Sequence, residues 1–180
     1  MEQRRGAPAR EPKPMRMDLI QPFINSADAV LAQGLESPIS IENLSMEEEA
    51  YRRKGIAAEV CLTGEIEGRI IFDVDQPAAA QLASRLAGVA VSETNDELIR
   101  EAVCELANQI IGNAVTTLND QGFHFHVRPP AIHTSEQGSK GSEDTEALVM
   151  GFKTSSGNVF MNVALRYHRR RAADRAAVAG

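Results

Sequence analysis

The sequence predicts an α+β domain, with a mainly antiparallel or mixed sheet and long helices packed on one face. Long segments carry apolar residues at helical spacing, whereas shorter segments are rich in β-branched residues and are bounded by glycine or acidic residues. The strand-like segments follow one another in runs joined by short turns, which favours antiparallel pairing over a regular alternation of strands and helices. The 180 residues, 43% of them hydrophobic, suffice for one domain with a substantial core.

Composition and charge divide the chain into three regions. Residues 1–16 lack periodicity, so we expect a flexible N-terminal segment, followed by an ordered domain at 17–168 and a flexible basic tail at 169–180. Because basic residues gather at both ends, the domain between them is acidic, which argues against nucleic acid as a partner. We expect no signal peptide, because no apolar segment follows the basic residues at the N-terminus. No apolar run approaches the length of about 18 residues that a membrane span needs. We therefore expect a cytoplasmic protein that does not contact a membrane.

The first helix is expected from Asp18 to about Gln33, with Asp18 as a capping residue and Gly34 as a stop. Apolar residues recur between these ends at helical spacing, which places them on one face turned to a core. They are Leu19, Ile20, Phe23, Ile24, Ala27, Val30 and Leu31.

Two further helices are predicted. One begins with Pro77, a residue favoured in the first helical turn, and ends at Gly88. The longest helix covers residues 92–120, and both Ser92 and Asn95 are plausible N-caps.

Six segments have the composition of strands. The second and third form a hairpin that closes near Gly64–Gly68, and the last two meet in a tight turn at Ser156–Asn158. Residues 136–146 are polar and rich in glycine and serine, which predicts a mobile loop. The strand segments are 37–46, 55–64, 68–75, 123–135, 147–156 and 158–168.

The longest helix has a polar face that helix stability alone does not explain. Asn108 and Gly112 together weaken the helix by roughly 1 to 2 kcal/mol relative to alanine. A short amide beside a residue without a side chain makes a shallow notch where another protein surface can approach closely. At about 100° per residue, the apolar face holds Ile99, Val103, Leu106, Ile110, Ala114 and Thr117, and the opposite face holds Glu101, Glu105, Asn108 and Gly112.

Within this helix, REAVCELANQIIGNAV resembles the signature helix of the CheC/CheX/FliY family of chemotaxis phosphatases, and the first helix resembles the opening helix of its CheX branch. The likeness covers most of residues 17–168. The family pattern is an Asp or Ser, three residues, a Glu, two residues, an Asn, and a proline about two dozen positions later. Glu105 and Asn108 match the Glu and the Asn. The motif occurs once, as in CheX, whereas CheC members typically carry two.

The resemblance implies a phosphatase that acts on the aspartyl phosphate of a CheY-type receiver domain, in chemotaxis or a related two-component pathway. Asn108 would orient the attacking water, because an amide donates and accepts hydrogen bonds without adding charge. Glu105 would pair with the receiver's active-site lysine, and Glu101 and Gly112 would line the docking surface. The Mg²⁺ would belong to the phosphorylated receiver, so the chain needs no cofactor of its own. The family also implies a homodimer, and we expect the strand at 158–168 at a sheet edge where two subunits pair.

Two departures from the family pattern leave an alternative open. Glu101 stands where the family usually has Asp or Ser, and Pro130 falls one position short of the usual proline. These departures favour a second interpretation, a receiver-binding or adaptor module of the same fold without catalysis. An enzyme would act in substoichiometric amounts, whereas a binding module would sequester the phosphorylated receiver or slow its decay.

Histidine and cysteine residues offer other chemistry. His124 and His126 alternate along a strand and His133 follows, a set that can bind zinc. The surrounding aromatic, valine and proline residues are more typical of an ordinary strand, so we predict no metal site. Cys61 and Cys104 lack metal-ligand spacing and do not lie in a short secreted frame, which predicts reduced thiols.

Overall fold

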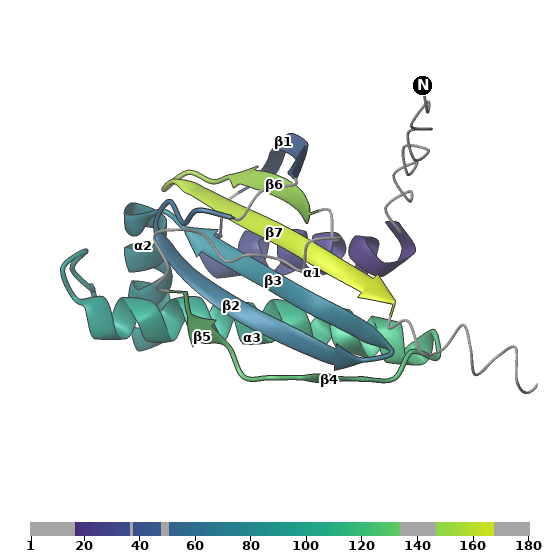
Figure 1. Ribbon diagram of the computed structural model, residues 1–180. Helices are drawn as coiled ribbons and strands as arrows, with labels where there is room; N and C mark the ends of the chain where they lie inside the picture. Colours follow the sequence, from purple (N-terminus) through teal and green to yellow (C-terminus); the bar gives the residue numbers. More distant parts are fainter. Residues whose placement is uncertain (1–16, 37, 48–50, 134–146, 168–180) are drawn as a thin grey trace, which may run out of the picture.

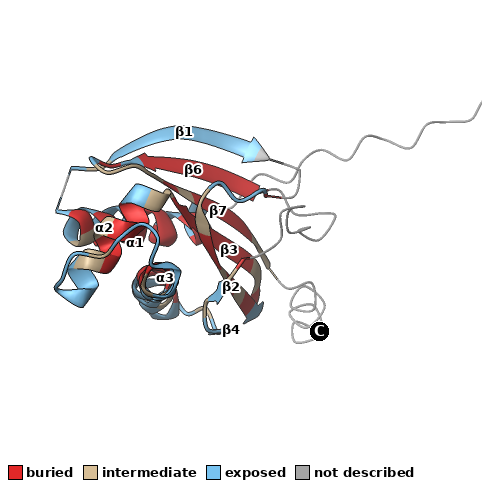
Figure 2. Ribbon diagram, turned by 90° about the vertical axis from the view of Figure 1, so that its left-hand side faces the viewer, coloured by how far each residue is buried: buried red, intermediate tan, exposed pale blue. Residues whose placement is uncertain are grey.

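In the computed structural model, three helices cover one face of a single antiparallel sheet (Figures 1 and 2). This arrangement confirms the predicted α+β fold. The flexible segments predicted at 1–16 and 169–180 and the loop predicted at 136–146 lie outside the described residues. The described residues are 17–36, 38–47, 51–133 and 147–167.

The helices lie close to their predicted positions. Helix α1 spans Met17–Leu35 and buries its predicted apolar stripe, and α2 spans Gln76–Ala87 with its proline in the first turn. Gly88 ends α2 in a left-handed conformation, with φ 69°, which glycine adopts without steric cost. None of the helices in the described part of the chain is long and apolar enough to cross a membrane.

Helix α3 spans Asp96–Asp120 and therefore begins four residues after Ser92. Asn95 is the N-cap, because its side chain accepts a hydrogen bond from the backbone N–H of Leu98 at 3.3 Å. Asp96 and Glu97 add negative charge to the first turn, where the helix dipole favours it. Of the two N-caps that the sequence offers, the structure uses Asn95.

The sheet has the strand order β1-β6-β7-β3-β2-β4, with the short β5 also paired to β2. All pairs are antiparallel. The β2–β3 hairpin turns at Glu65, and Gly68 lies inside β3, where an added Cβ would come within 2.0 Å of the Ala164 carbonyl oxygen. The strands are β1 Ser40–Glu47, β2 Ile56–Gly64, β3 Ile66–Val74, β4 Phe125–Val127, β5 Ala131–Ile132, β6 Ala147–Lys153 and β7 Asn158–Tyr167.

Strand β7 contradicts one prediction. We expected it at a sheet edge, but it lies between β6 and β3 near the centre of the sheet. Its middle residues are buried on both faces, as in Met161 and Asn162, and such a nearly continuous buried run is typical of a central strand. The outer strand on this side is β1, which pairs only with β6 among the described strands.

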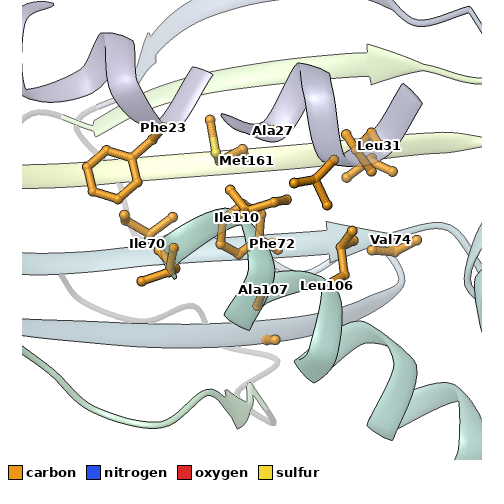
Figure 3. Packing of buried hydrophobic residues seen from close by; sticks show 14 of the residues in the cluster. Phe23, Ala27, Leu31, Ile70, Phe72, Val74, Leu106, Ala107, Ile110 and Met161 are labelled. Atoms are coloured by element: carbon orange, nitrogen blue, oxygen red, sulfur yellow. The ribbon is translucent and has the colours of Figure 1, made fainter. Parts of the chain in front are cut away.

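The main core lies between the helices and the sheet. Figure 3 shows α1 and α3 contributing side chains that meet those of β3 and β7. Phe23 and Phe72 are fully buried there, so helix and sheet residues form one continuous apolar layer. The labelled members are Phe23, Ala27, Leu31, Ile70, Phe72, Val74, Leu106, Ala107, Ile110 and Met161.

The opposite face of the sheet carries a polar anchor around Asp73, which is completely buried. The Tyr51 hydroxyl donates to Oδ2 of Asp73 at 2.8 Å, and the backbone N–H of Gly55 donates to Oδ1 of Asp73 at 2.7 Å. The backbone N–H of Lys54 also donates to Oδ2. A buried carboxylate is tolerated when hydrogen bonds satisfy it, so Asp73 fixes the segment that precedes β2 to the sheet.

Candidate functional site

The polar face of α3 is exposed as the helical spacing predicts. Glu101, Glu105, Asn108 and Gly112, which we call the polar stripe, are all exposed. The helix presents these groups on a rigid rod, because its other side is buried against α1, α2 and β2. The roles assigned to the four residues stay predictions at this point.

The prediction that Thr117 belongs to the apolar face of α3 is wrong. Thr117 is exposed, and its hydroxyl donates to the Asn113 carbonyl oxygen at 3.2 Å. The buried side of α3 moves around the helix axis, from Ile99 near its start to Leu118 near its end. A straight helix that crosses its neighbours at an angle shows this drift, and a fixed period of 100° per residue cannot anticipate it.

The Asn108 amide has no hydrogen-bond partner among the described residues and is open to solvent. Glu105, three residues earlier, accepts a hydrogen bond from the Gln109 side chain at 3.1 Å. Sequence reasoning missed Gln109, although its spacing of four from Glu105 is a known pairing distance on helices. Gln109 restrains one oxygen of the carboxylate, so the stripe combines an oriented acid with an amide that is free to bind water.

Gly112 has no internal packing role. Apart from the neighbouring backbone of its own helix, a Cβ added at this position would meet no described atom within 4 Å, and the backbone is helical. Glycine costs about 1 kcal/mol relative to alanine inside a helix. No contact in the described structure offsets this cost, which leaves the bare backbone available for a surface outside the chain.

Small residues bring α1 and α3 close together behind the stripe. Ala27 on α1 and Ala107 on α3 are fully buried, and both lie near Ile110 in Figure 3. The Ser26 hydroxyl of α1 donates a hydrogen bond of 2.8 Å to the carbonyl oxygen of Ile110. The exposed stripe is therefore supported from behind by both apolar packing and a directional contact.

Neither cysteine is poised as a nucleophile. Both are free and half-buried. Burial raises the pKa of Cys104, which lies beside Glu105, and burial followed by the charge of Glu59 raises the pKa of Cys61. A raised thiol pKa leaves little thiolate at neutral pH, so neither thiol is primed for nucleophilic attack.

The histidines do not gather into one site. His124 and His126 line an open pocket near the end of α3 together with Glu65, whose carboxylate accepts a hydrogen bond from the His124 backbone at 2.9 Å. His133 instead pairs through Nδ1 with Glu59 at 3.1 Å. Across the described ranges, no group of three or more His, Cys, Asp or Glu residues is arranged to hold a metal.

The pocket is also far from Asn108 along α3. It includes Asn119, which lies eleven residues beyond Asn108, or roughly 16 Å along the helix axis. The stripe itself lies on a convex helix surface. This geometry suits the approach of another macromolecule better than the enclosure of a small ligand.

Comparison with known proteins identifies the family. The family described as chemotaxis phosphatase CheX matches residues 56–153. A chain in the structure of the CheX–CheY–BeF3–Mg²⁺ complex from Borrelia burgdorferi shares 34% sequence identity with this chain and has a TM-score of 0.66. The match covers 84% of this chain and 99% of the other. A CheC-like protein from Shewanella sp. PV-4 shares the fold, with a TM-score of 0.74, 19% identity and coverage of 84% and 99%.

Thermotoga maritima FliY also shares the fold, at 18% identity and a TM-score of 0.59, with 82% of this chain and 86% of the other covered. A search of curated proteins found no match. The family match spans more than half of the sequence, and the B. burgdorferi protein is similar over most of its length. The chain therefore belongs to the CheX family of chemotaxis phosphatases.

Proposed function

We propose that the chain accelerates hydrolysis of the aspartyl phosphate on a CheY-type receiver domain, with Asn108 orienting the water and Glu105 engaging the receiver. One observation carries the proposal: an exposed amide without a partner among the described residues lies one turn from an oriented carboxylate, on a helix whose other side is buried. The neighbour from B. burgdorferi forms a complex with CheY, BeF3 and Mg²⁺, which supports a receiver as the partner.

The chemistry needs little more than these two groups. An acyl phosphate is hydrolysed by in-line attack of water through a loose transition state, so positioning the water is the main contribution. Asn108 supplies an uncharged donor and acceptor for that water. Glu105 would pair with the receiver's lysine, which neutralises the carboxylate and sets the register of docking. The Mg²⁺ would come with the receiver, and a cytoplasmic location follows from such a partner.

The direct test is the decay of a phosphorylated CheY-type receiver with and without a tenth of an equivalent of this protein. Catalysis predicts faster decay with several turnovers per molecule. Unchanged or slower decay, with binding still measurable, would replace the proposal with the non-catalytic module that Glu101 and the shifted Pro130 favour.

Gly112→Ala should raise the stability of the protein and weaken its binding to the receiver. Outside its own stretch of helix, the added methyl meets no atom of the described residues, so we expect the free energy of unfolding to rise by about 1 kcal/mol. The same methyl would hold the receiver away from the helix and raise the Kd about fivefold. Urea unfolding and titration calorimetry measure the two effects. Asn113→Ala, on the same helix but off the stripe, is the control that should leave the affinity unchanged.

We also propose that two copies pair through β1, in place of the β7 edge that we first expected. Ile41, Leu44 and Met46 lie on one side of β1 and are 50%, 61% and 49% exposed. Alternating apolar residues on an outer strand with an unpaired edge are typical of strand pairing between subunits.

A lysine on this strand tests the dimer. Leu44→Lys should shift the protein toward monomers, because it places a charge on each copy at the shared edge. Val89→Lys, at another exposed apolar residue between α2 and α3, is the matched control. Sedimentation velocity over a range of concentrations measures the mass. If the two variants had the same mass at every concentration, pairing through β1 would be contradicted.

A further inference from the structure

Ser26 is a polar exception on the buried face of α1. It is 7% exposed, and the other residues of that face are almost all apolar. Its hydroxyl donates to the carbonyl oxygen of Ile110 at 2.8 Å, which joins residues 84 positions apart in the sequence. The contact differs from the hydroxyl bonds of Thr116 and Thr117, which only reach carbonyls four residues back on α3 itself.

Satisfying buried polar groups does not explain this serine. The Ile110 carbonyl lies inside α3, where the helix already supplies it with a backbone donor. A carbonyl oxygen can accept a second hydrogen bond, but it does not need one. Alanine at position 26 would remove the hydroxyl and leave no buried group without a partner, so the bond has to be explained by what it does to α3.

The hydrogen bond from Ser26 adds a directional restraint to the packing around it. Ala27, Ala107 and Ile110 pack behind the stripe, and this close packing limits large movements of α3. A hydrogen bond has a preferred angle as well as a distance. The bond from Ser26 therefore restrains both rotation of α3 about its axis and sliding along it.

The Ile110 carbonyl that Ser26 binds is close to the Asn108 amide along α3. Ile110 lies two residues beyond Asn108, within the same helical turn. With side-chain tips about 5 to 6 Å from the axis, a rotation of about 20° moves a tip by about 2 Å. A displacement of about 1 Å can reduce catalysis about 100-fold when a water must be aligned. Small rotations of α3 would therefore be costly for the Asn108 amide.

We infer that Ser26 is a positioning residue, which fixes the rotation of α3 through its bond to the Ile110 carbonyl and so aims Asn108 at the water. The inference rests on the proposed phosphatase function for its catalytic consequence. Glu105 depends less on this restraint, because a longer side chain can adjust to its partner after a small rotation.

Ser26→Ala is the first variant to measure. We expect kcat for receiver dephosphorylation to fall about three- to tenfold, while KM for the phosphorylated receiver changes less than twofold. Ser26→Thr keeps the hydroxyl and should recover most of kcat. The matched control is Ala27→Gly, which weakens the same helix interface without removing the bond. It should lower stability and leave kcat unchanged at temperatures where the protein stays folded.

A second measurement does not depend on activity. Residual dipolar couplings of α3 amides and the side-chain amide resonance of Asn108 report the orientation and mobility of the stripe. Ser26→Ala should reorient α3 or broaden the Asn108 resonance, whereas Ala27→Gly should not. If the wild-type protein dephosphorylates the receiver but Ser26→Ala matches it in kcat and in these spectra, the positioning role is overturned and the phosphatase stands. If the wild-type protein is inactive, the phosphatase proposal fails, and the spectra still decide whether Ser26 fixes α3.

Discussion

Asn108→Ala should lower the catalysed rate of receiver dephosphorylation by about 100-fold or more, with little change in receiver affinity. Removing one oriented polar group from a transition state commonly costs about 100- to 1,000-fold in rate. The Asn108 side chain is exposed and makes no hydrogen bond within the described chain, so its loss should not disturb the fold. Single-turnover decay of the phosphorylated receiver, with affinity measured separately, distinguishes chemistry from binding.

Asn113→Ala is the control for this experiment, because Asn113 is an exposed asparagine on the same helix outside the polar stripe. It should retain full activity. Full activity in Asn108→Ala, or equal losses in both variants, would remove Asn108 from the catalytic role. Circular dichroism would show whether either variant had changed in helix content.

Glu105→Lys should weaken receiver binding about 100-fold. The substitution replaces an attraction between a carboxylate and a lysine by repulsion between two cations, and losing a close charge pair at an interface costs about 2 to 5 kcal/mol. Among the described residues, Glu105 accepts a hydrogen bond only from the exposed Gln109 side chain, so folding should be nearly unaffected. Titration calorimetry at two salt concentrations would measure both the affinity and its electrostatic part.

A charge exchange makes this test specific. A receiver in which the active-site lysine is replaced by glutamate should bind Glu105→Lys better than it binds the wild-type protein. Glu101→Lys, one turn earlier on the stripe, should have a smaller effect, because Glu101 is assigned only to the border of the docking surface. Affinity that is unchanged in Glu105→Lys would rule out the proposed ion pair.

Helices were predicted more completely than the sheet. The periodic apolar residues of α1 and the start and stop residues of α2 are local signals, so the sequence alone indicated both helices to within a few residues. Strand segments were also recognisable, but the order of strands depends on contacts between distant residues. The central place of β7 was missed because composition indicates a strand without naming its neighbours.

The candidate site shows a similar division. The exposed positions of Glu105 and Asn108 follow from their spacing on one helix, and the family pattern supplied their proposed roles. Gln109 could have been found from its position four residues after Glu105. The contact from Ser26 could not, because a lone serine in an apolar stripe does not indicate which distant carbonyl it will meet.

The central position of β7 also governs the order in which the chain can fold during its synthesis. Strand β7 is the last strand of the described chain, yet β3 and β6 both pair with it. While β7 is still inside the ribosome, the β2–β3 hairpin keeps an open edge, and β1 and β6 can join it only through β7. Incomplete chains would expose these edges to pairing with other chains, so translation that stops before β7 should yield products that aggregate.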